Sequence, residues 1–219
     1  MTPWPAGMLA ELREWTHKNG IHLILDEVMT GFGRTGKMFA CQHENVTPDF
    51  LCLAKGLTAG YLPMAATLTT ETIYEGFLGP REHAFYYGHS YTANQLGCAV
   101  ALASLDLFQQ ENTLEKVQQL SEHLNSELIA LSERCSYVYE TRQAGLVSGI
   151  EIRKKDSAPF PSNLRIGLQV CEAALTHQLL TRPILDTIVF MPPYCIKKEE
   201  ISQAILAIEK AINEVTTSQ

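Results

Sequence analysis

The sequence lacks any excess of basic residues, with 17 Lys and Arg against 24 Asp and Glu and a formal net charge of −7 at pH 7. Nucleic acids and anionic membranes attract basic patches, so this balance argues against both as partners. No apolar run approaches the roughly 20 residues of a membrane span, and the N-terminus lacks the basic start and apolar core of a signal peptide. We therefore expect a soluble, cytoplasmic protein.

Cysteine pairs at metal-ligand spacing are also missing. The one close combination, Cys41 with His43, has no second pair of ligands elsewhere in the sequence. The pattern predicts reduced, mostly buried thiols and no metal site. The six cysteines, none of them in a C-x-x-C pair, are Cys41, Cys52, Cys98, Cys135, Cys171 and Cys195.

What remains is the composition of an ordinary globular protein, 46% apolar and 19% charged over 219 residues. This composition excludes disorder and collagen-like or low-complexity structure. The length suffices for one large domain or two small ones.

The first half of the chain has the pattern of an α/β domain. Apolar residues at helical spacing predict a helix over residues 6–19, and a short buried strand follows at 21–25. Two further apolar runs, 50–54 and 64–68, are too short for helices and are interpreted as strands. A helix followed by a strand, repeated, indicates a parallel sheet.

The second half is predicted to contain more helix, and no internal repeat is present. The change of pattern predicts part of a large parallel-sheet domain at 1–105 and a smaller α+β domain at 106–219. The expected elements are helices at 92–108 and 112–134, strands at 136–141 and 146–152, a helix ending near Gln178, short strands around Thr181 and Val189, and a last helix with an isoleucine stripe.

A glycine-rich stretch from Gly31 to Lys37 satisfies the phosphate-loop pattern G-x-x-x-x-G-K. However, Met38 stands where a Ser or Thr should bind magnesium. The acidic stretch 23–27 also precedes the loop, whereas in nucleotide hydrolases it follows on another strand. A structural turn is therefore favoured over a nucleotide site.

An acid and a lysine are each predicted at the end of a strand. Asp26 directly follows the run 21–25, and Lys55 directly follows the run 50–54. Ligands of open α/β sheets bind at the carboxyl ends of strands, so the two side chains are expected to face one crevice. The apolar run before Lys55 suggests partial desolvation of its ammonium group, which favours a nucleophilic amine. Pyridoxal phosphate requires such a lysine, and an acid for its ring nitrogen.

Three stretches in order, at 25–36 (LDEVMTGFGRTG), 49–57 (DFLCLAKGL) and 88–94 (GHSYTAN), resemble the signature of class III pyridoxal-phosphate aminotransferases of fold type I. The resemblance implies that the large domain of this fold contributes residues 1–105 and the small α+β domain residues 106–219. It also implies pyridoxal 5'-phosphate as cofactor and small-molecule substrates.

The resemblance assigns a role to individual residues. Asp26 is implied to pair with the pyridinium nitrogen, Val28 to pack against the ring, and Lys55 to bind the cofactor covalently and act as the catalytic base. Ser90, where many members have Thr, is implied to reach the cofactor phosphate of a neighbouring subunit, with His89 beside it. A homodimer follows from this last role.

Two further residues are implied to bind substrate, Gly88 and Arg182. Arg182 precedes Pro183, and no Arg occurs in the strand 187–191 before the Pro-Pro pair, a pattern that resembles the biotin-biosynthesis branch of the family. In that branch the arginine binds the distal carboxylate of the keto substrate, for which a guanidinium fork is suited. The amino donor, S-adenosylmethionine in most such relatives and lysine in some, is left open.

The resemblance covers nearly all of this chain but only the C-terminal half of the family's length. The loop that cradles the cofactor phosphate and the aromatic residue that stacks on the ring have no counterpart here. We therefore expect a partial gene product or an internal start. The alternatives are another class III ω-aminotransferase and a non-catalytic subunit that pairs with a separate N-terminal half.

Overall fold

The structure, a computed structural model, describes residues 2–217. It divides the chain into two compact units: Trp4–Leu114, here the N-terminal unit, and the chain from Glu115 onward, here the C-terminal unit. The sequence pattern places the change earlier, near residue 106. Within residues 2–217, no helix combines the length and the apolar character needed to cross a lipid bilayer.

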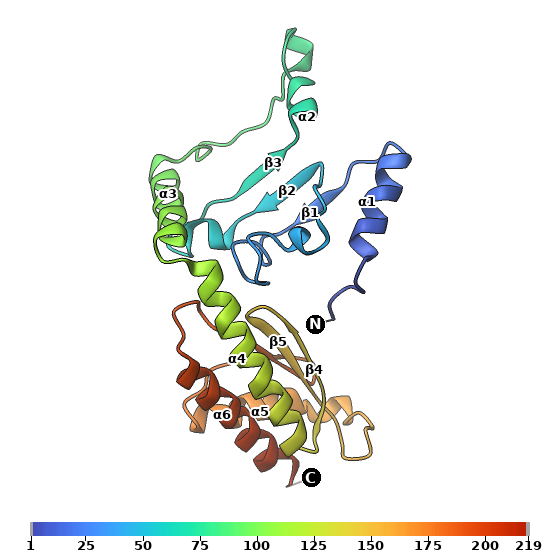
Figure 1. The fold of residues 1–219 in the computed structure, drawn as a ribbon, viewed down its shortest axis with the longest axis vertical. Helices are drawn as coiled ribbons and strands as arrows, with labels where there is room; N and C mark the ends of the chain where they lie inside the picture. Colours follow the sequence, from blue (N-terminus) through green and yellow to red (C-terminus); the bar gives the residue numbers. More distant parts are fainter. Residues whose placement is uncertain (1, 218–219) are drawn as a thin grey trace. The chain divides into compact units, whose positions relative to one another are not determined.

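The N-terminal unit is built around a three-stranded sheet, drawn in blue to green in Figure 1. The label η denotes a short 3-10 helix. The elements of the N-terminal unit are α1 (Met8–Lys18), β1 (Ile24–Asp26), η1 (Ala40–Glu44), β2 (Phe50–Leu53), η2 (Lys55–Thr58), β3 (Ala66–Thr69), α2 (Glu71–Glu75), η3 (Arg81–His83) and α3 (Gln95–Gln110).

The sheet is mixed rather than fully parallel. β1 and β2 run parallel, as expected, whereas β3 pairs with β2 in the antiparallel direction. The expectation of an all-parallel sheet was therefore wrong at this strand. The connection between β2 and β3 contains only η2 and turns, without the α-helix that a crossover between parallel strands normally uses.

Only one face of this sheet is well covered. Successive side chains of a strand point to opposite faces, and in β2 Leu51 and Leu53 are buried while Phe50 and Cys52 are half-buried. Leu51 and Leu53 pack against Phe32 in a small apolar cluster. The core of this unit is therefore thin and lies on one side of the sheet.

The C-terminal unit contains a four-stranded antiparallel sheet in the order β4-β5-β7-β6 and has one large core. The leucines of α4 and the isoleucine stripe of α6, both predicted from helical spacing, are buried in this core. The elements of this part are α4 (Thr113–Arg134), β4 (Val138–Ala144), β5 (Val147–Ile152), η4 (Ser162–Leu164), α5 (Ile166–Thr176), β6 (Arg182–Ile184), β7 (Thr187–Phe190) and α6 (Lys198–Thr216).

Gly167, in the first turn of α5, holds the turn between β6 and β7 in place. A Cβ atom at this position would lie 2.1 Å from the carbonyl oxygen of Leu185 and 3.0 Å from Cα of Asp186. The Gly167 N–H also donates to Oδ1 of Asp186 at 2.9 Å. The close approach fixes the hairpin that carries Arg182.

We expect Gly167→Ala to lower the free energy of unfolding by about 1–3 kcal/mol, because the added methyl group must push a backbone carbonyl away. The loss should appear although alanine favours a helix over glycine by about 1 kcal/mol. Thermal unfolding followed by circular dichroism measures it. Gly97→Ala in α3 is the control, since its nearest neighbour is the flexible side chain of Met64. Equal stability of the two variants would refute the tight contact.

Candidate active site

Asp26 and Lys55 lie at the same edge of the sheet. In the parallel pairing of β1 with β2, Asp26 is opposite Cys52, and Lys55 begins η2 two residues after the end of β2. Asp26, the last residue of β1, and Lys55 therefore lie at the carboxyl ends of adjacent parallel strands. Ligands of α/β sheets bind at this edge, so the expected juxtaposition at one edge is present.

Asp26 and its neighbour Glu27 face different surroundings. Asp26 is exposed, and its Oδ1 accepts a hydrogen bond from the Val28 N–H at 2.9 Å. Glu27 is only 3% exposed, and its carboxylate accepts the N–H groups of Ala40 at 2.6 Å and Cys41 at 2.8 Å. The exposed acid is available to a ligand, whereas the buried acid anchors the loop that follows.

The contact with Glu27 also affects the pKa of the Cys41 thiol. Burial first, and then the hydrogen bond to Glu27 and the charge of Glu27, raise the pKa of the thiol to about 11. The thiol is therefore protonated at neutral pH and is a poor nucleophile. Glu27 was missed by the sequence interpretation, although the alternation of a strand already places it opposite to Asp26.

Lys55 is exposed rather than partly desolvated, which corrects the expectation drawn from the apolar run before it. Lys55 lies two residues beyond the end of β2, with a φ of 27°, so the alternation that buries Leu51 and Leu53 does not extend to it. Gly56 is packed tightly, since a Cβ there would lie 2.7 Å from Cβ of Phe32. The packing of Phe32 thus fixes the backbone next to the lysine.

The glycine-rich stretch 31–37 forms turns, and the short η1 follows it instead of the long helix of a phosphate loop. A Cβ at Gly31 would lie 2.8 Å from the Glu27 carbonyl oxygen, and Gly33 has a φ of 90°. The glycines are needed for packing and for backbone conformation, which agrees with a structural turn.

His89 and Ser90 lie in a long exposed segment. Every residue from 74 to 96 is exposed, and Nδ1 of His89 accepts the Tyr91 N–H at 3.1 Å. Within residues 2–217, neither residue forms a hydrogen bond with Asp26 or Lys55. Gly88 is exposed in the same segment. The exposed aromatic side chains of this segment are Tyr74, Phe77, Phe85, Tyr86, Tyr87 and Tyr91.

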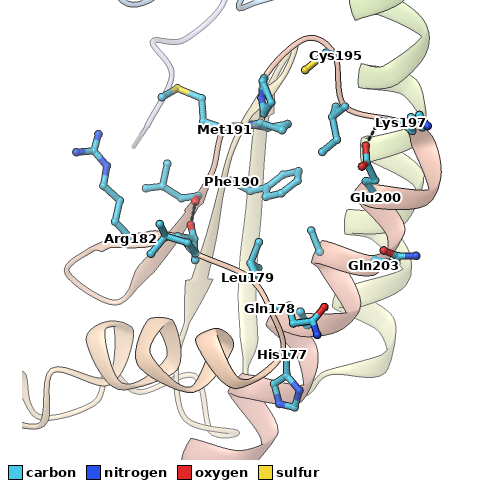
Figure 2. Close-up of a pocket in the computed structure, with 18 residues that line it drawn as sticks. His177, Gln178, Leu179, Arg182, Phe190, Met191, Cys195, Lys197, Glu200 and Gln203 are labelled. Atoms are coloured by element: carbon cyan, nitrogen blue, oxygen red, sulfur yellow. Dashed lines mark hydrogen bonds between the residues drawn. The ribbon is translucent and has the colours of Figure 1, made fainter.

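Arg182 belongs to the C-terminal unit, where it is exposed at the start of β6 and lies at a cleft of about 870 Å³. In Figure 2 its guanidinium points away from the side of the cleft formed by α6. Phe190 and Leu179 contribute apolar surface, and on α6 Glu200 accepts the Lys197 N–H at 2.7 Å. A free guanidinium beside apolar surface suits a carboxylate on an aliphatic chain.

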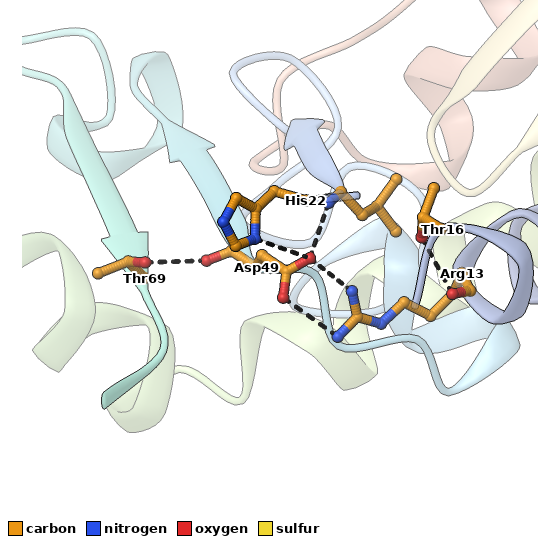
Figure 3. A network of polar contacts seen from close by, with 6 residues as sticks. Arg13, Thr16, His22, Asp49 and Thr69 are labelled. Carbon is orange, nitrogen blue, oxygen red and sulfur yellow. Dashed lines mark hydrogen bonds and ion pairs between the residues drawn. The ribbon is translucent and has the colours of Figure 1, made fainter. Parts of the chain in front are cut away.

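An ion pair between Arg13 and Asp49, at the opposite end of β2 from Lys55, was not predicted from the sequence. Figure 3 shows Arg13 of α1 against Asp49, with Nη1 2.6 Å from Oδ2, while the same oxygen accepts the Leu23 N–H at 2.7 Å. The Thr69 hydroxyl donates to the Asp49 carbonyl oxygen at 3.0 Å. The hydrogen bond from Arg13 is the main cause that lowers the pKa of Asp49. Asp49 thus links α1, β1 and β3 at the start of β2.

The residues at the sheet edge fit the cofactor that the resemblance implies. An exposed acid and an exposed amine stand at the ends of adjacent strands, and within residues 2–217 neither Asp26 nor Lys55 is part of an ion pair. Both are therefore open to a ring nitrogen and an aldehyde, the two groups that pyridoxal phosphate presents.

Comparison with known proteins gave consistent matches. The family model described as aminotransferase class-III matches residues 1–212. The adenosylmethionine-8-amino-7-oxononanoate aminotransferase of Aquifex aeolicus is 44% identical over 98% of this chain and 48% of its own length. The crystal structure of the protein with that name from Methanocaldococcus jannaschii has a TM-score of 0.91 and 42% identity over 98% of this chain and 50% of its own.

An S-selective transaminase from Arthrobacter has a TM-score of 0.93 at 26% identity, over 100% of this chain and 49% of its own. The chain thus spans about half the length of the relatives that it matches.

We expect Asp49→Asn to destabilise the N-terminal unit by about 1–3 kcal/mol at pH 7, because a charge-assisted pair with Arg13 is lost. A lowered carboxyl pKa stabilises the fold above the unfolded value of about 3.9 and ceases to do so as pH falls through the folded value. The difference from wild type should therefore shrink below about pH 4.

Urea unfolding at pH 7 and pH 3, followed by tryptophan fluorescence, tests this, since Trp4 and Trp15 both belong to the N-terminal unit. Asp106→Asn, an exposed position on α3, is the control and should change little. A difference that stays constant between the two pH values would contradict the role of the Asp49 charge.

Proposed function

Since the chain belongs to the class-III aminotransferase family, whose members are pyridoxal-phosphate-dependent transaminases, we propose that it supplies the cofactor-binding lysine and acid of such an enzyme. The proposed reaction is the conversion of 8-amino-7-oxononanoate to 7,8-diaminononanoate in biotin biosynthesis. The observation that carries the proposal is the register of β1 and β2, which brings Asp26 and Lys55 to one sheet edge.

In this proposal Lys55 would hold the aldehyde carbon of the cofactor, Asp26 would hold the proton on its ring nitrogen, and Val28 would contact the ring. When bound, pyridoxal phosphate supplies an electron sink for negative charge that develops at a substrate carbon. The amine of Lys55 would move a proton from the donor carbon to the cofactor in the first half-reaction, and from the cofactor to the acceptor carbon in the second. The exposed side chain of Lys55 would reach both the cofactor and the donor carbon.

We also propose a homodimer in which Ser90 and His89 reach the cofactor phosphate of the neighbouring subunit. The exposure of the whole segment 74–96, with its aromatic side chains, supports a position at an interface. A cytoplasmic location is proposed as well, because every cysteine is free in the structure.

The keto substrate is assigned from Arg182, with Gly88 as a second contact. The exposed guanidinium would bind the distal carboxylate of 8-amino-7-oxononanoate. The relatives at 41–44% identity are named for both 8-amino-7-oxononanoate and adenosylmethionine, which supports S-adenosylmethionine as the amino donor.

A second candidate function is another ω-transamination. A (S)-enantioselective omega-transaminase from Thermomicrobium roseum shares the fold with a TM-score of 0.90 at 35% identity. The higher identity of the 8-amino-7-oxononanoate enzymes favours the first candidate. The third possibility, a non-catalytic fragment, predicts no selective reaction of Lys55 with the cofactor.

Pyridoxal phosphate added to the purified chain, followed by borohydride, is expected to modify Lys55 in preference to other lysines, because Asp26 would hold the ring nearby. Peptide mass spectrometry locates the adduct. It should be absent from Lys55→Ala and retained in Lys37→Ala, an exposed lysine of the same unit. Equal modification of Lys55 and Lys37 would favour the non-catalytic alternative.

In an active assembly, Arg182→Ala is expected to raise KM for 8-amino-7-oxononanoate by about tenfold to a hundredfold, since a charge-assisted hydrogen bond to the carboxylate is lost. KM for the amino donor should not change. Steady-state transaminase kinetics measure both values, and Lys154→Ala, an exposed cation of the same unit, is the control. An unchanged KM would remove Arg182 from the substrate site.

A further inference from the structure

The backbone of Lys55 has an uncommon conformation. Its φ of 27° lies in the left-handed region, which residues with a Cβ atom seldom occupy because the Cβ crowds the neighbouring carbonyl oxygen. Such a conformation persists only where surrounding contacts hold it, and residues of this kind gather at functional sites. The contacts around Lys55 therefore bear on its role.

The turn that contains Lys55 is closed by hydrogen bonds. The Leu57 N–H donates to the Ala54 carbonyl oxygen at 2.7 Å, and the Ser104 hydroxyl of α3 donates to the Gly56 carbonyl oxygen at 3.4 Å. The first bond keeps the turn tight, and the second attaches it to α3. Neither bond involves the loop after β1, so side-chain packing must place the turn relative to that loop.

Phe32 supplies this packing. A Cβ added at Gly56 would lie 2.7 Å from Cβ and 2.8 Å from Cδ2 of Phe32, closer than Cβ atoms normally approach another atom. Phe32 is only 3% exposed and has a φ of 57°, so it too occupies the left-handed region. Two strained residues from separate loops, Phe32 and Lys55, therefore meet on either side of one glycine.

Phe32 also belongs to the loop that begins at the end of β1, directly after Asp26. The Gly31 N–H donates to the Glu27 carbonyl oxygen at 2.9 Å, which returns the chain to the end of the strand just before Phe32. The Phe39 ring packs edge-on against Phe32, with 5.9 Å between the ring centroids. A short series of contacts thus links the acid's strand to the turn that carries the lysine.

We propose that Phe32 is a positioning residue, whose contact with Gly56 sets the place of Lys55 relative to Asp26. This role rests on the proposed function, because only a ligand held by both groups at once requires a set spacing between them. The ring of pyridoxal phosphate is rigid, so a small displacement of either group weakens its hold. The lysine side chain is flexible, so packing fixes only the backbone from which it starts.

A purely structural role of Phe32 makes a different prediction. If the ring only filled the core, a similar loss of volume elsewhere in its cluster would have the same effect on the turn. Phe39 offers this comparison, because it packs in the same cluster. The three atoms nearest to a Cβ at Gly56, however, all belong to Phe32.

Hydrogen exchange of the chain without cofactor, resolved by NMR, is the first test. We expect the Leu57 N–H to exchange at least about tenfold faster in Phe32→Leu, because the turn loses the ring against which it packs. The Glu27 N–H, which donates to the Cys52 carbonyl oxygen at 2.9 Å, reports on the sheet and should exchange as in wild type. Phe39→Leu should change neither rate by more than about threefold. Equal exchange at Leu57 in the two variants would overturn the proposal.

Gly56→Ala tests the same contact without removing apolar surface. The added methyl group must push Phe32 and the turn apart, so exchange at Leu57 should again rise by about tenfold. Gly97→Ala, whose nearest neighbour is the flexible side chain of Met64, is the control and should leave exchange at Leu57 unchanged. Unchanged exchange at Leu57 in Gly56→Ala would show that the contact does not place the turn, and would overturn the proposal.

The second test adds pyridoxal phosphate and borohydride. The ratio of adduct on Lys55 to adduct on Lys37 should fall about tenfold in both Phe32→Leu and Gly56→Ala, whereas Phe39→Leu should keep the wild-type ratio. Both variants retain Lys55 and Asp26, so a lower ratio reports their spacing. A wild-type preference for Lys55 that persists in both variants would overturn the proposal and leave the proposed function standing. No preference in wild type would count against the proposed function, while exchange at Leu57 would still decide whether Phe32 places the turn.

Discussion

The parallel pairing of β1 with β2 is the interaction on which the candidate site depends. Because the register places Asp26 opposite Cys52, the acid and Lys55 emerge at one edge although they are 29 positions apart in the sequence. A shift of the register by one residue would turn Asp26 to the other face and replace it with Glu27 or Leu25. The chemistry proposed for this chain is therefore a consequence of strand register more than of any single side chain.

The neighbouring acids Asp26 and Glu27 have different roles, because successive side chains along a strand point to opposite faces. Glu27 is buried and satisfied by backbone N–H groups, so it stabilises the loop after β1 and cannot serve a ligand. Asp26 is exposed, with one of its oxygens accepting from Val28. Asp49 adds a third role, since its pairing with Arg13 ties α1 to the sheet. Two buried or partly buried acids thus hold the framework that presents the exposed one.

The sequence predicted the elements in which apolar residues recur at regular spacing. It failed for features that depend on contacts between residues far apart in the chain. The helical spacing of Leu124 and Ile208 predicted their burial because a helix has one face to cover. The direction of β3 depends on the short connection that follows β2. The exposure of Lys55 depends on where β2 ends and on which face of the sheet is covered, and no local sequence pattern encodes either. Likewise, Arg13 and Asp49 are 36 residues apart, so their pairing appears only in the fold.

The distribution of apolar burial separates stability from chemistry in this chain. The C-terminal unit has a continuous core in which Leu124, Ile150 and Ile208 are fully buried, whereas the N-terminal unit buries only small clusters and exposes Ile24. Segments with few buried apolar contacts open most readily, and anything that binds only their ordered form stabilises them. Asp26 and Lys55 therefore lie on the unit that buries the smaller apolar clusters, so a ligand bound between them is expected to stabilise that unit.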